Sequence, residues 1–377
     1  METVSEGNAS IENFSFDGKF GEYFRIWIVN TSLSILTLGV YSAWATVRNR
    51  RYLYRSTRLA GSGFDFHASP MAILKGRSIA VFLLAGYLGI SFLLPGAEIF
   101  VALAITLCLP WFIVRSRMFR LWNTSYRNIR FSFASVVGAA ARVILGIGLL
   151  IGFSFGLIYP YYKYRRADLI VNNSRFGNLP FALNKLTSGF YWRYLGAGLA
   201  LIAGSLILST IYDFSAITDV TNVGQDAVEK AEMEVIEDFP ESEPTDEDGG
   251  PEIDSGMLAS IGGIVFGYFL IFMVVATYLG ASVLKLVLNN VSVGKHRLRC
   301  NWSVWRLVCI RLSNFVLVIF SLGLLVPLAT IRTQRYQLNN LAIEVHGDID
   351  AIVSGEGLQV SAIGDELGDV FDFDLGL

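Results

Sequence analysis

The chain has 377 residues, of which 53% are hydrophobic and only 16% are charged, whereas an average soluble domain has about 25% charged residues. This composition excludes an ordinary soluble protein. The formal net charge of −2 conceals a segregation, because the acidic residues gather at the N-terminus, between 213 and 254, and from Glu344 onward, while nearly all Lys and Arg lie in the chain between these acidic segments. Cationic residues beside apolar segments are typical of a multi-pass membrane protein and predict anionic membrane lipids as partners.

Apolar residues occur in blocks that are, in most cases, long enough to cross a bilayer, whose hydrocarbon core of roughly 30 Å requires about 20 residues of helix. In chain order the blocks cover residues 26–47, 78–94, 97–114, 143–162, 194–212, 257–284 and 312–331. Pro95-Gly96 separates the short second and third blocks, which indicates a tight helical hairpin.

One segment recurs three times, and each copy joins an apolar block to an arginine-rich stretch. Alignment of Arg48, Arg165 and Arg332 also superimposes Thr37 on Ser154 and Ser321. The glycines Gly39, Gly156 and Gly323 coincide as well, and Ala43 coincides with Pro160 and Pro327. Self-similarity of this kind indicates a repeat architecture, and the Gly and Pro positions predict a break in each helix.

A smaller unit recurs five times, in which a basic stretch and a polar turn precede a short alternating or aromatic segment such as Phe64-Asp-Phe66 or Phe131-Ser-Phe133. Alternation with a period of two favours half-buried strands, so short interfacial strands remain an open alternative. The predicted fold is an all-α polytopic membrane protein, with three internal repeats of Gly/Pro-broken helices joined by two transmembrane hairpins.

The predicted organisation is a disordered N-terminus (1–13), a single membrane domain (14–347) and an acidic tail (348–377). The repeats run over about 14–66, 131–183 and 300–346, and the hairpins over 78–114 and 194–284. The second hairpin contains an acidic insertion at 215–254, whose low hydrophobicity and high charge predict a disordered loop.

The sequence contains little that points to catalysis. His67, His296 and His346 are far apart and outside the apolar blocks, and the three cysteines (Cys108, Cys300, Cys309) are too few and too scattered for a zinc site. No nucleophile elbow, phosphate-binding loop or zinc-protease motif occurs. We therefore predict no enzymatic activity, no catalytic residue, no cofactor, no metal and no nucleic-acid partner.

The arginines are the candidate binding residues. Arg48, Arg51, Arg55 and Arg58 are spaced to share one face of a helix. Such a face commonly extends to lipid headgroups and sets topology. The alternative is a specific site for an anion or a lipid headgroup, to which Arg175, Arg332 and Arg335 would also contribute.

Two topologies are open. If each repeat crosses the membrane once, there are seven spans, and Lys and Arg divide 14 to 16 between the two sides. If each repeat instead enters and returns at its Gly break, the division is 29 to 1, with Lys230 alone on the far side, as the positive-inside bias favours. Either arrangement places the acidic insertion across the membrane from the basic regions 163–193 and 285–311.

Three stretches of sequence resemble the YjgN-like family of bacterial inner-membrane proteins, a family of unknown function. They are Phe16-Asp-Gly-Lys-Phe-Gly-Glu22-Tyr-Phe-Arg25, Leu36-Thr-Leu-Gly39-Val-Tyr-Ser-Ala-Trp44-Ala-Thr-Val-Arg48 and Ser56-Thr-Arg58-Leu-Ala-Gly61. The chain departs from the family in its long acidic insertion and in Leu341-Ala342, where the third repeat lacks the Thr-Arg pair. The resemblance implies residence in the bacterial inner membrane and no particular activity.

Two functions follow as hypotheses. The first is a transport, pore or lipid-moving protein, because internal repeats and broken helices are typical of transporters. The alternative is a membrane scaffold that binds anionic lipid or a protein partner through basic interfacial helices. The interiors of the apolar blocks lack ionisable residues, which favours the alternative over ion-coupled transport. Neither a homo-oligomer nor a protein partner is specified.

Overall fold

The computed structural model describes residues 10–94, 96–211 and 255–346, with the side chains of 255–260 left out. The chain divides into two compact units, one of residues 1–192 and 281–377 and the other of residues 193–280. The acidic insertion and the acidic tail lie entirely outside the described residues, as do residues 1–9 of the predicted disordered N-terminus. Residues 10–13, which the same prediction included, belong to a strand.

The first unit contains a closed barrel of ten antiparallel strands, in the order β1-β10-β9-β8-β7-β6-β5-β4-β3-β2. The barrel closes where β1 pairs with β10, through Ser10 opposite Val345 and Asn13 opposite Ala342. The strands are β1 (Ser10–Phe16), β2 (Thr57–Leu59), β3 (Ser62–Phe66), β4 (Thr124–Tyr126), β5 (Ile129–Phe133), β6 (Ser174–Phe176), β7 (Leu179–Leu183), β8 (Val291–Val293), β9 (His296–Cys300) and β10 (Leu341–Val345).

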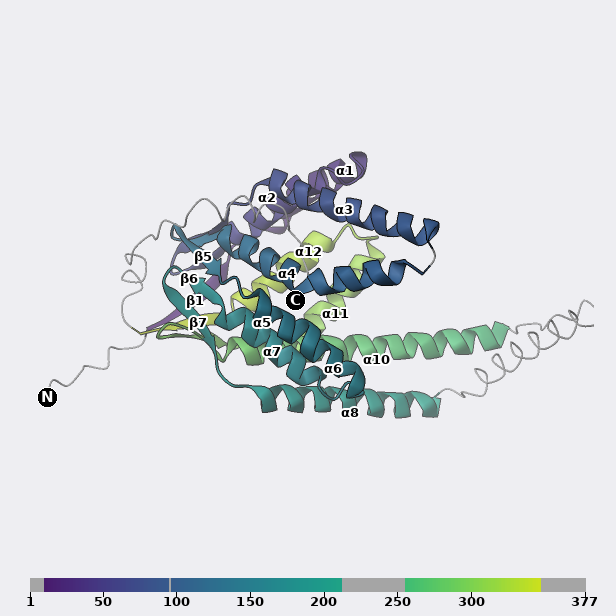
Figure 1. Ribbon diagram of the computed structural model, residues 1–377. Helices are drawn as coiled ribbons and strands as arrows, with labels where there is room; N and C mark the ends of the chain where they lie inside the picture. Colours follow the sequence, from purple (N-terminus) through teal and green to yellow (C-terminus); the bar gives the residue numbers. More distant parts are fainter. Residues whose placement is uncertain (1–9, 95, 212–254, 347–377) are drawn as a thin grey trace, which may run out of the picture. The chain divides into compact units, whose positions relative to one another are not determined.

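Helices connect pairs of strands that are neighbours in the barrel, so the chain leaves the barrel and returns to it five times. Tight turns join the remaining neighbours, for example β2 to β3. In Figure 1 the helices of the first unit extend away from the end that holds its strands. The helical segments are α1 (Phe20–Leu36), α2 (Ser42–Arg55), α3 (Pro70–Leu93), α4 (Glu98–Trp122), α5 (Val137–Ala141), the π-helix η1 (Arg142–Ile147), α6 (Gly148–Phe153), α7 (Tyr159–Asn172), α8 (Thr187–Ile211), α10 (Ser255–Leu288), α11 (Val304–Phe320) and α12 (Val326–Leu338).

The all-α prediction is therefore wrong. The recurring alternating segments, which the sequence left open as interfacial strands, close into one barrel. Each strand has between three and seven residues, and so short a strand gives a weak local signal and is stable only when both of its edges are paired. Closure supplies both partners, even for β1 and β10 at opposite ends of the chain.

The interior of the barrel is filled with apolar side chains, and the outward residues that alternate with them are polar in most strands. Leu59, Tyr126, Phe176 and Val293 are its buried centre. The half-buried residues packed on them are Phe14, Phe64, Ile129, Phe131, Leu179, Phe181 and Ile343. Ring centroids lie 4.7 Å apart for Phe64 and Tyr126, and 4.9 Å apart for Phe131 and Phe176, a spacing typical of packed aromatic pairs. The barrel is a hydrophobic core rather than a channel.

Each of the three sequence repeats forms a strand, a pair of helices and a second strand. In the first repeat, α1 and α2 fold back on each other, because Asn30 on α1 donates through Nδ2 to Asn49 Oδ1 on α2 at 2.8 Å. In the third repeat, Asn314 Nδ2 donates at 3.0 Å to Thr333 Oγ1 across the same kind of hairpin. The two arms of each repeat also end on paired strands. The chain therefore reverses direction within each repeat.

Among the described residues, four helices are long and apolar enough to cross a membrane: Pro70–Leu93, Glu98–Trp122, Thr187–Ile211 and Ile261–Leu288. The last two supply the second unit, where an added Cβ at Gly204 would lie 2.8 Å from Ile271 and one at Gly267 would lie 2.6 Å from Leu208. These glycines allow close antiparallel packing, which is usual between membrane helices.

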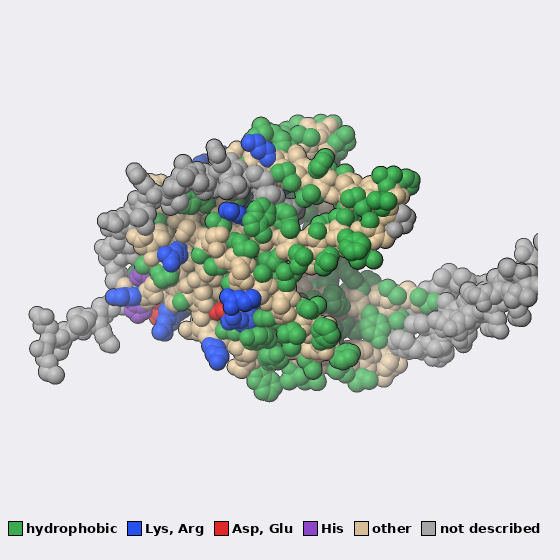
Figure 2. Space-filling model, viewed as in Figure 1, with side chains coloured by type: hydrophobic (Ala, Val, Ile, Leu, Met, Phe, Trp, Pro, Cys, Tyr) green, Lys and Arg blue, Asp and Glu red, His purple; other side chains and the backbone are tan. Residues whose placement is uncertain are grey.

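The surface divides by chemistry in the way the sequence predicts. On the face shown in Figure 2, Lys and Arg gather mainly towards the strands, and hydrophobic side chains cover the helices α3 and α4. Leu88 and Phe92 on α3 and Ile99 and Phe100 on α4 are among the exposed apolar residues. Apolar helices that extend from a basic barrel are suited to a bilayer with anionic headgroups.

His296 is expected to make the barrel sensitive to pH. Its side chain is buried, and its Nδ1 accepts a hydrogen bond of 3.1 Å from the backbone N–H of His346. Burial, together with the nearby His346, lowers the pKa of His296 below its ordinary value. The unfolded chain therefore binds a proton more readily, and stability should fall as the pH falls below about 6.5. Thermal unfolding between pH 8 and pH 5 measures this effect.

In His296→Asn, the Oδ1 atom can accept the same hydrogen bond without titrating. This variant should lose less stability than the wild type over that pH interval. Equal losses in the two proteins would show that His296 is not the group that titrates.

Candidate functional site

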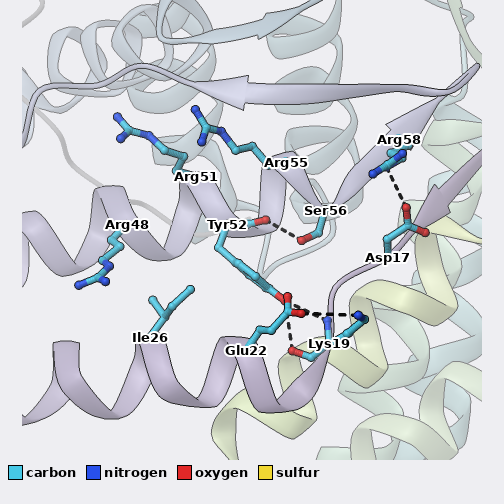
Figure 3. Close-up of a pocket in the computed structure, with 10 residues that line it drawn as sticks. All are labelled: Asp17, Lys19, Glu22, Ile26, Arg48, Arg51, Tyr52, Arg55, Ser56 and Arg58. Carbon is cyan, nitrogen blue, oxygen red and sulfur yellow. Dashed lines mark hydrogen bonds and ion pairs between the residues drawn. The ribbon is translucent and has the colours of Figure 1, made fainter.

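A pocket of about 480 Å³ lies beside the first repeat, between α1, α2 and the strands that flank them. Figure 3 shows its lining side chains. The residues are Asp17, Lys19, Glu22, Ile26, Arg48, Arg51, Tyr52, Arg55, Ser56 and Arg58. Five cationic side chains thus face two carboxylates. The volume lies within the range of about 300–1,000 Å³ that is common for small-molecule sites.

The four arginines predicted to share a helix face all line this pocket. The prediction of a single helix is wrong for Arg58, because α2 ends at Arg55 and Arg58 lies on β2. The helix ends where Ser56 and Thr57 donate their hydroxyl hydrogens to the carbonyls of Tyr52 and Leu53. Hydroxyl groups that bond to the preceding turn of backbone compete with helix continuation.

Three of the four guanidinium groups have partners within the protein. Arg51 Nε donates to the carbonyl of Phe66 at 3.2 Å, and Arg58 Nε lies 2.8 Å from Asp17 Oδ2. Arg55 forms a bidentate pair with Asp65 at 3.0 and 2.9 Å. Figure 3 shows the Arg51 and Arg55 side chains directed away from Glu22. These arginines give the pocket a positive potential while they brace α2 against the strands.

The Asp65 carboxyl is held in its charged form. Burial alone would raise its pKa, but the hydrogen bonds from Arg55 and from the backbone N–H of Phe66 outweigh burial, so the pKa lies below the ordinary value. The same pairing raises the pKa of Arg55. This ion pair therefore persists across the physiological pH range.

Tyr52 ties α2 to the start of α1. Its hydroxyl accepts the N–H of Lys19 at 2.9 Å and lies 3.1 Å from the Lys19 carbonyl and 3.2 Å from Glu22 Oε2. Burial raises the pKa of this phenol. The equivalent Tyr336 makes the same pair of bonds to the backbone of Ser303 in the third repeat. Because the same hydrogen bonds recur in two repeats, we infer that this tyrosine has a structural role.

Arg48 differs from its two counterparts. Arg332 donates through Nη1 to Asn314 Oδ1 at 3.0 Å, and Arg165 lies 3.1 Å from Asp168 Oδ2. Arg48 is exposed and has no hydrogen-bond or ion-pair partner among the residues that the structure describes. Figure 3 shows it beside Ile26, apart from the other arginines. Of the four guanidinium groups that line the pocket, it is the one without a partner in the described part of the chain.

The other predicted site residues do not join this pocket. Arg175 lies on β6, opposite Ser132 on β5, and points outward from the barrel. Arg332 is held within the third repeat by Asn314, and Arg335 donates to the carbonyl of Gly18 at 2.8 Å. A single anion site assembled from arginines of all the repeats is therefore not what the structure contains.

The predicted helix breaks are all present at turns between paired helices. Gly39, Gly156 and Gly323 have φ of +91°, +83° and +89°, which glycine adopts readily and other residues rarely do. Pro160 and Pro327 stand in the first turn of α7 and α12, where proline removes no helical hydrogen bond.

Sequence reasoning did not identify the polar residues inside the repeats. Asn30 and Asn314 are 1% and 6% exposed and occupy equivalent positions within apolar helices. A buried asparagine in an otherwise apolar block is the signal that could have identified them. A second cavity, of about 260 Å³, lies against Asn30, Thr31, Ser34 and Asn49.

The side chains that line the pocket are suited to binding an anion. In the described part of the chain, no group of three or more His, Cys, Asp or Glu could hold a metal ion. The lining offers guanidinium donors and one apolar residue, Ile26. Such a set suits a phosphate or carboxylate group attached to an apolar body.

Comparison with known proteins agrees with the resemblance in the sequence. Residues 11–370 match the model of a family described as bacterial protein of unknown function (DUF898). The chain belongs to this family. A relative named inner membrane protein YjgN, from Salmonella typhimurium, is 24% identical over 390 residues, which cover 89% of each chain.

Proteins of the same name from Escherichia coli O157:H7 and Escherichia coli K12 are each 24% identical over 159 residues, or 42% of this chain and 40% of theirs. No solved structure matches. With relatives named inner membrane proteins and four membrane-length apolar helices, the chain is a multi-pass protein of the bacterial inner membrane.

Proposed function

We propose that this protein is a lipid-binding scaffold of the inner membrane, which holds an anionic phospholipid headgroup in the pocket of the first repeat. The observation that carries the proposal is that Arg48 has no partner in the described part of the chain. The equivalent arginines of the other two repeats, Arg332 and Arg165, bind Asn314 and Asp168. A phosphate would be the natural counter-ion of Arg48.

The depth of the pocket supports a headgroup as the ligand. The tip of the α1–α2 hairpin is at Gly39, and α2 begins at Ser42. Counted at the helical rise of 1.5 Å per residue, the chain from Gly39 to Arg48 spans about 14 Å. This distance is close to the thickness of one leaflet of hydrocarbon, about 15 Å. With the apolar tip in the membrane, Arg48 would lie at the level of the phosphates. Ile26 would then lie against the first methylenes of the acyl chains.

The barrel argues against transport along its axis. Aromatic rings from β1, β3, β4, β5, β6 and β7 fill its interior. A path for solutes would need a polar or water-filled lining. A lipid-moving protein would use the same headgroup pocket as a scaffold. The two functions therefore differ in whether the bound lipid crosses the bilayer.

Arg48→Gln should weaken the binding of anionic lipid about tenfold or more, because a hydrogen bond to a charged group contributes about 1.5–3 kcal/mol. The measurement is the amount of phosphatidylglycerol retained by purified protein in native mass spectrometry, or its affinity in nanodiscs. The matched control is Arg175→Gln, which removes the same charge from the outer face of β6 and should leave lipid binding unchanged.

Equal losses in the two variants would indicate a diffuse effect of charge, and no loss in Arg48→Gln would reject the pocket as the binding site. Liposomes that contain the wild-type protein provide the second test. Protein-dependent transfer of labelled lipid between leaflets would replace the scaffold proposal with the lipid-moving one.

A further inference from the structure

Each of the three repeat hairpins ends in a tip of fully exposed apolar side chains. Leu38, Phe155 and Leu322 occupy equivalent positions and are 96%, 98% and 93% exposed. The residues two positions before and after them are also large, apolar and exposed in all three tips: Leu36, Val40, Phe153, Leu157, Phe320 and Leu324. Single exposed apolar residues are common on protein surfaces, but the same exposed apolar cluster in three repeats indicates an interaction surface.

The backbone of each tip satisfies its own hydrogen bonds. In the first repeat the six consecutive N–H groups from Thr37 to Ser42 all donate within the turn, five of them to carbonyls and that of Tyr41 to Thr37 Oγ1 at 2.9 Å. The six N–H groups from Ser154 to Tyr159 and from Ser321 to Val326 do the same in the other repeats, with Ser154 Oγ and Ser321 Oγ as the equivalent acceptors.

This pattern explains the recurring Thr/Ser-x-Gly of the sequence. The hydroxyl at the first position donates to the preceding turn and accepts from the following helix. The glycine N–H closes the helix end, through Gly39 to Ser34 at 2.7 Å and Gly323 to Val318 at 2.8 Å. A turn with every donor used internally is what hydrocarbon requires, because no water is present to pair with a free N–H.

The tips also hold a bulky residue in a strained conformation. Leu38, Phe155 and Leu322 have φ of +50°, +48° and +50°, at the helix-end position where glycine is usual. A large apolar side chain in this region is uncommon and costs energy. Its presence at the same place in three repeats indicates that the apolar side chain itself is required there.

The turn of the first spanning hairpin has different chemistry. Between α3 and α4, the N–H of Gly96 donates to the carboxylate of Glu98 at 2.6 Å, so a charged side chain stands at this tip. A charge is suited to water on the far side of the membrane and is costly in its interior. The repeat tips carry no charged residue from Leu36 to Val40, from Phe153 to Leu157, or from Phe320 to Leu324.

Helix lengths place the two kinds of tip at different depths. The arm α3 has 24 residues and α1 has 17, and the return arms α4 and α2 have 25 and 14. At 1.5 Å per residue, the spanning hairpin extends about 10–16 Å beyond the repeat hairpin. In a hydrocarbon core of about 30 Å, a repeat tip then ends near the middle of the bilayer.

We propose that the three repeat hairpins are re-entrant and that Leu38, Phe155 and Leu322 contact the acyl chains at the bilayer midplane. The partner of this surface is the hydrocarbon of the leaflet that faces the barrel. The protein then occupies that leaflet with three half-depth hairpins beside helices that cross both leaflets. The inference stands on tip chemistry and helix length, and it does not depend on a lipid in the Arg48 pocket.

The test measures depth with spin labels on the full-length protein. Single cysteines replace Leu38, Phe155 and Leu322 in a background without Cys108, Cys300 and Cys309, and each labelled protein is placed in nanodiscs of phosphatidylethanolamine and phosphatidylglycerol. Collision with oxygen and with a water-soluble nickel chelate then reports depth. The controls are Leu94→Cys at the spanning tip and Ser15→Cys on the barrel.

We expect the three repeat labels to collide frequently with oxygen and to be shielded from the chelate, at a depth of about 15 Å from the phosphates. The Leu94 and Ser15 labels should be accessible to the chelate. Chelate access at the repeat tips, or a depth equal to that of Leu94, would overturn the proposal. If a tip cysteine impairs folding, labels at Leu36, Phe153 and Phe320 report the same depth from residues with ordinary backbone.

Discussion

Replacement of Phe66 by alanine is expected to lower the free energy of unfolding of the barrel by about 3–5 kcal/mol. Phe66 ends β3 and is completely buried, with its ring 5.6 Å from that of Tyr54 and 5.7 Å from the guanidinium carbon of Arg50. It joins the barrel to α2 and α3 through the cluster that contains Val47 and Ile73. Alanine would leave a cavity at this junction.

The measurement is unfolding of the purified protein in detergent, followed by circular dichroism. Phe92→Ala is the control, because Phe92 is 87% exposed on α3 and its loss leaves no cavity in the protein. Similar destabilisation by the two changes would mean that the junction is not a packed core.

The sequence predicted the helical parts of the fold well, because long apolar blocks give a strong local signal. The turn at Pro95-Gly96 falls between Leu93 and Glu98, where α3 ends and α4 begins. The block 26–47 was less informative. It reads as one apolar segment, but the chain turns back within it, after Leu36. The glycine at the break predicted where the helix is interrupted, but not that the chain reverses direction there.

The barrel could not be predicted from local pattern. Strands such as β2 and β4 have three residues, too few to show alternation with confidence. Their pairing also joins distant parts of the chain, as in Phe14 with Leu59 and Phe181 with Val293. The five recurring polar turns were the available signal, because each of them joins the end of a helix to the start of a strand.

The candidate site was predicted in part. The spacing of Arg48, Arg51 and Arg55 placed them correctly on one helix, but spacing does not show which guanidinium groups are already paired. Asp65, which binds Arg55, lies on β3, and Asn314, which binds Arg332, lies across a hairpin. Only tertiary structure separates an available arginine from a structural one.

The three repeats share the helical hairpin and differ at the position of Asn30 inside it, either in the residue or in its hydrogen bonds. The third repeat satisfies its buried asparagine with an arginine, whereas in the first repeat Asn30 Oδ1 is buried without a hydrogen-bond partner and Arg48 faces the pocket. The second repeat has Ile147 in place of the asparagine and a π-helix over Arg142–Ile147. Divergence in the hydrogen bonds at one position within a common hairpin therefore accompanies the loss, at Arg48, of the internal partner that its third-repeat equivalent, Arg332, has.

An aspartate in place of Leu38 is expected to destabilise the membrane-inserted protein by about 2.5–3.5 kcal/mol, the apparent cost of a charge at the centre of a membrane helix. The side chain is 96% exposed and touches little of the protein. A tip in water would accept aspartate within about 0.5 kcal/mol, as exposed positions usually do. The size of the loss therefore reports the environment of the tip and not its packing.

The same substitution at Leu94 is the matched control, because Leu94 is also exposed and apolar but lies at the end of α3 next to the turn that Glu98 caps. Leu38→Asp should reduce the amount of folded protein recovered from membranes and lower its unfolding midpoint in nanodiscs, while Leu94→Asp should leave both nearly unchanged. Phe155→Asp and Leu322→Asp should behave as Leu38→Asp does, because the three turns have the same hydrogen bonds. If all four variants are equally stable, the repeat tips lie in water, and the half-depth arrangement is wrong.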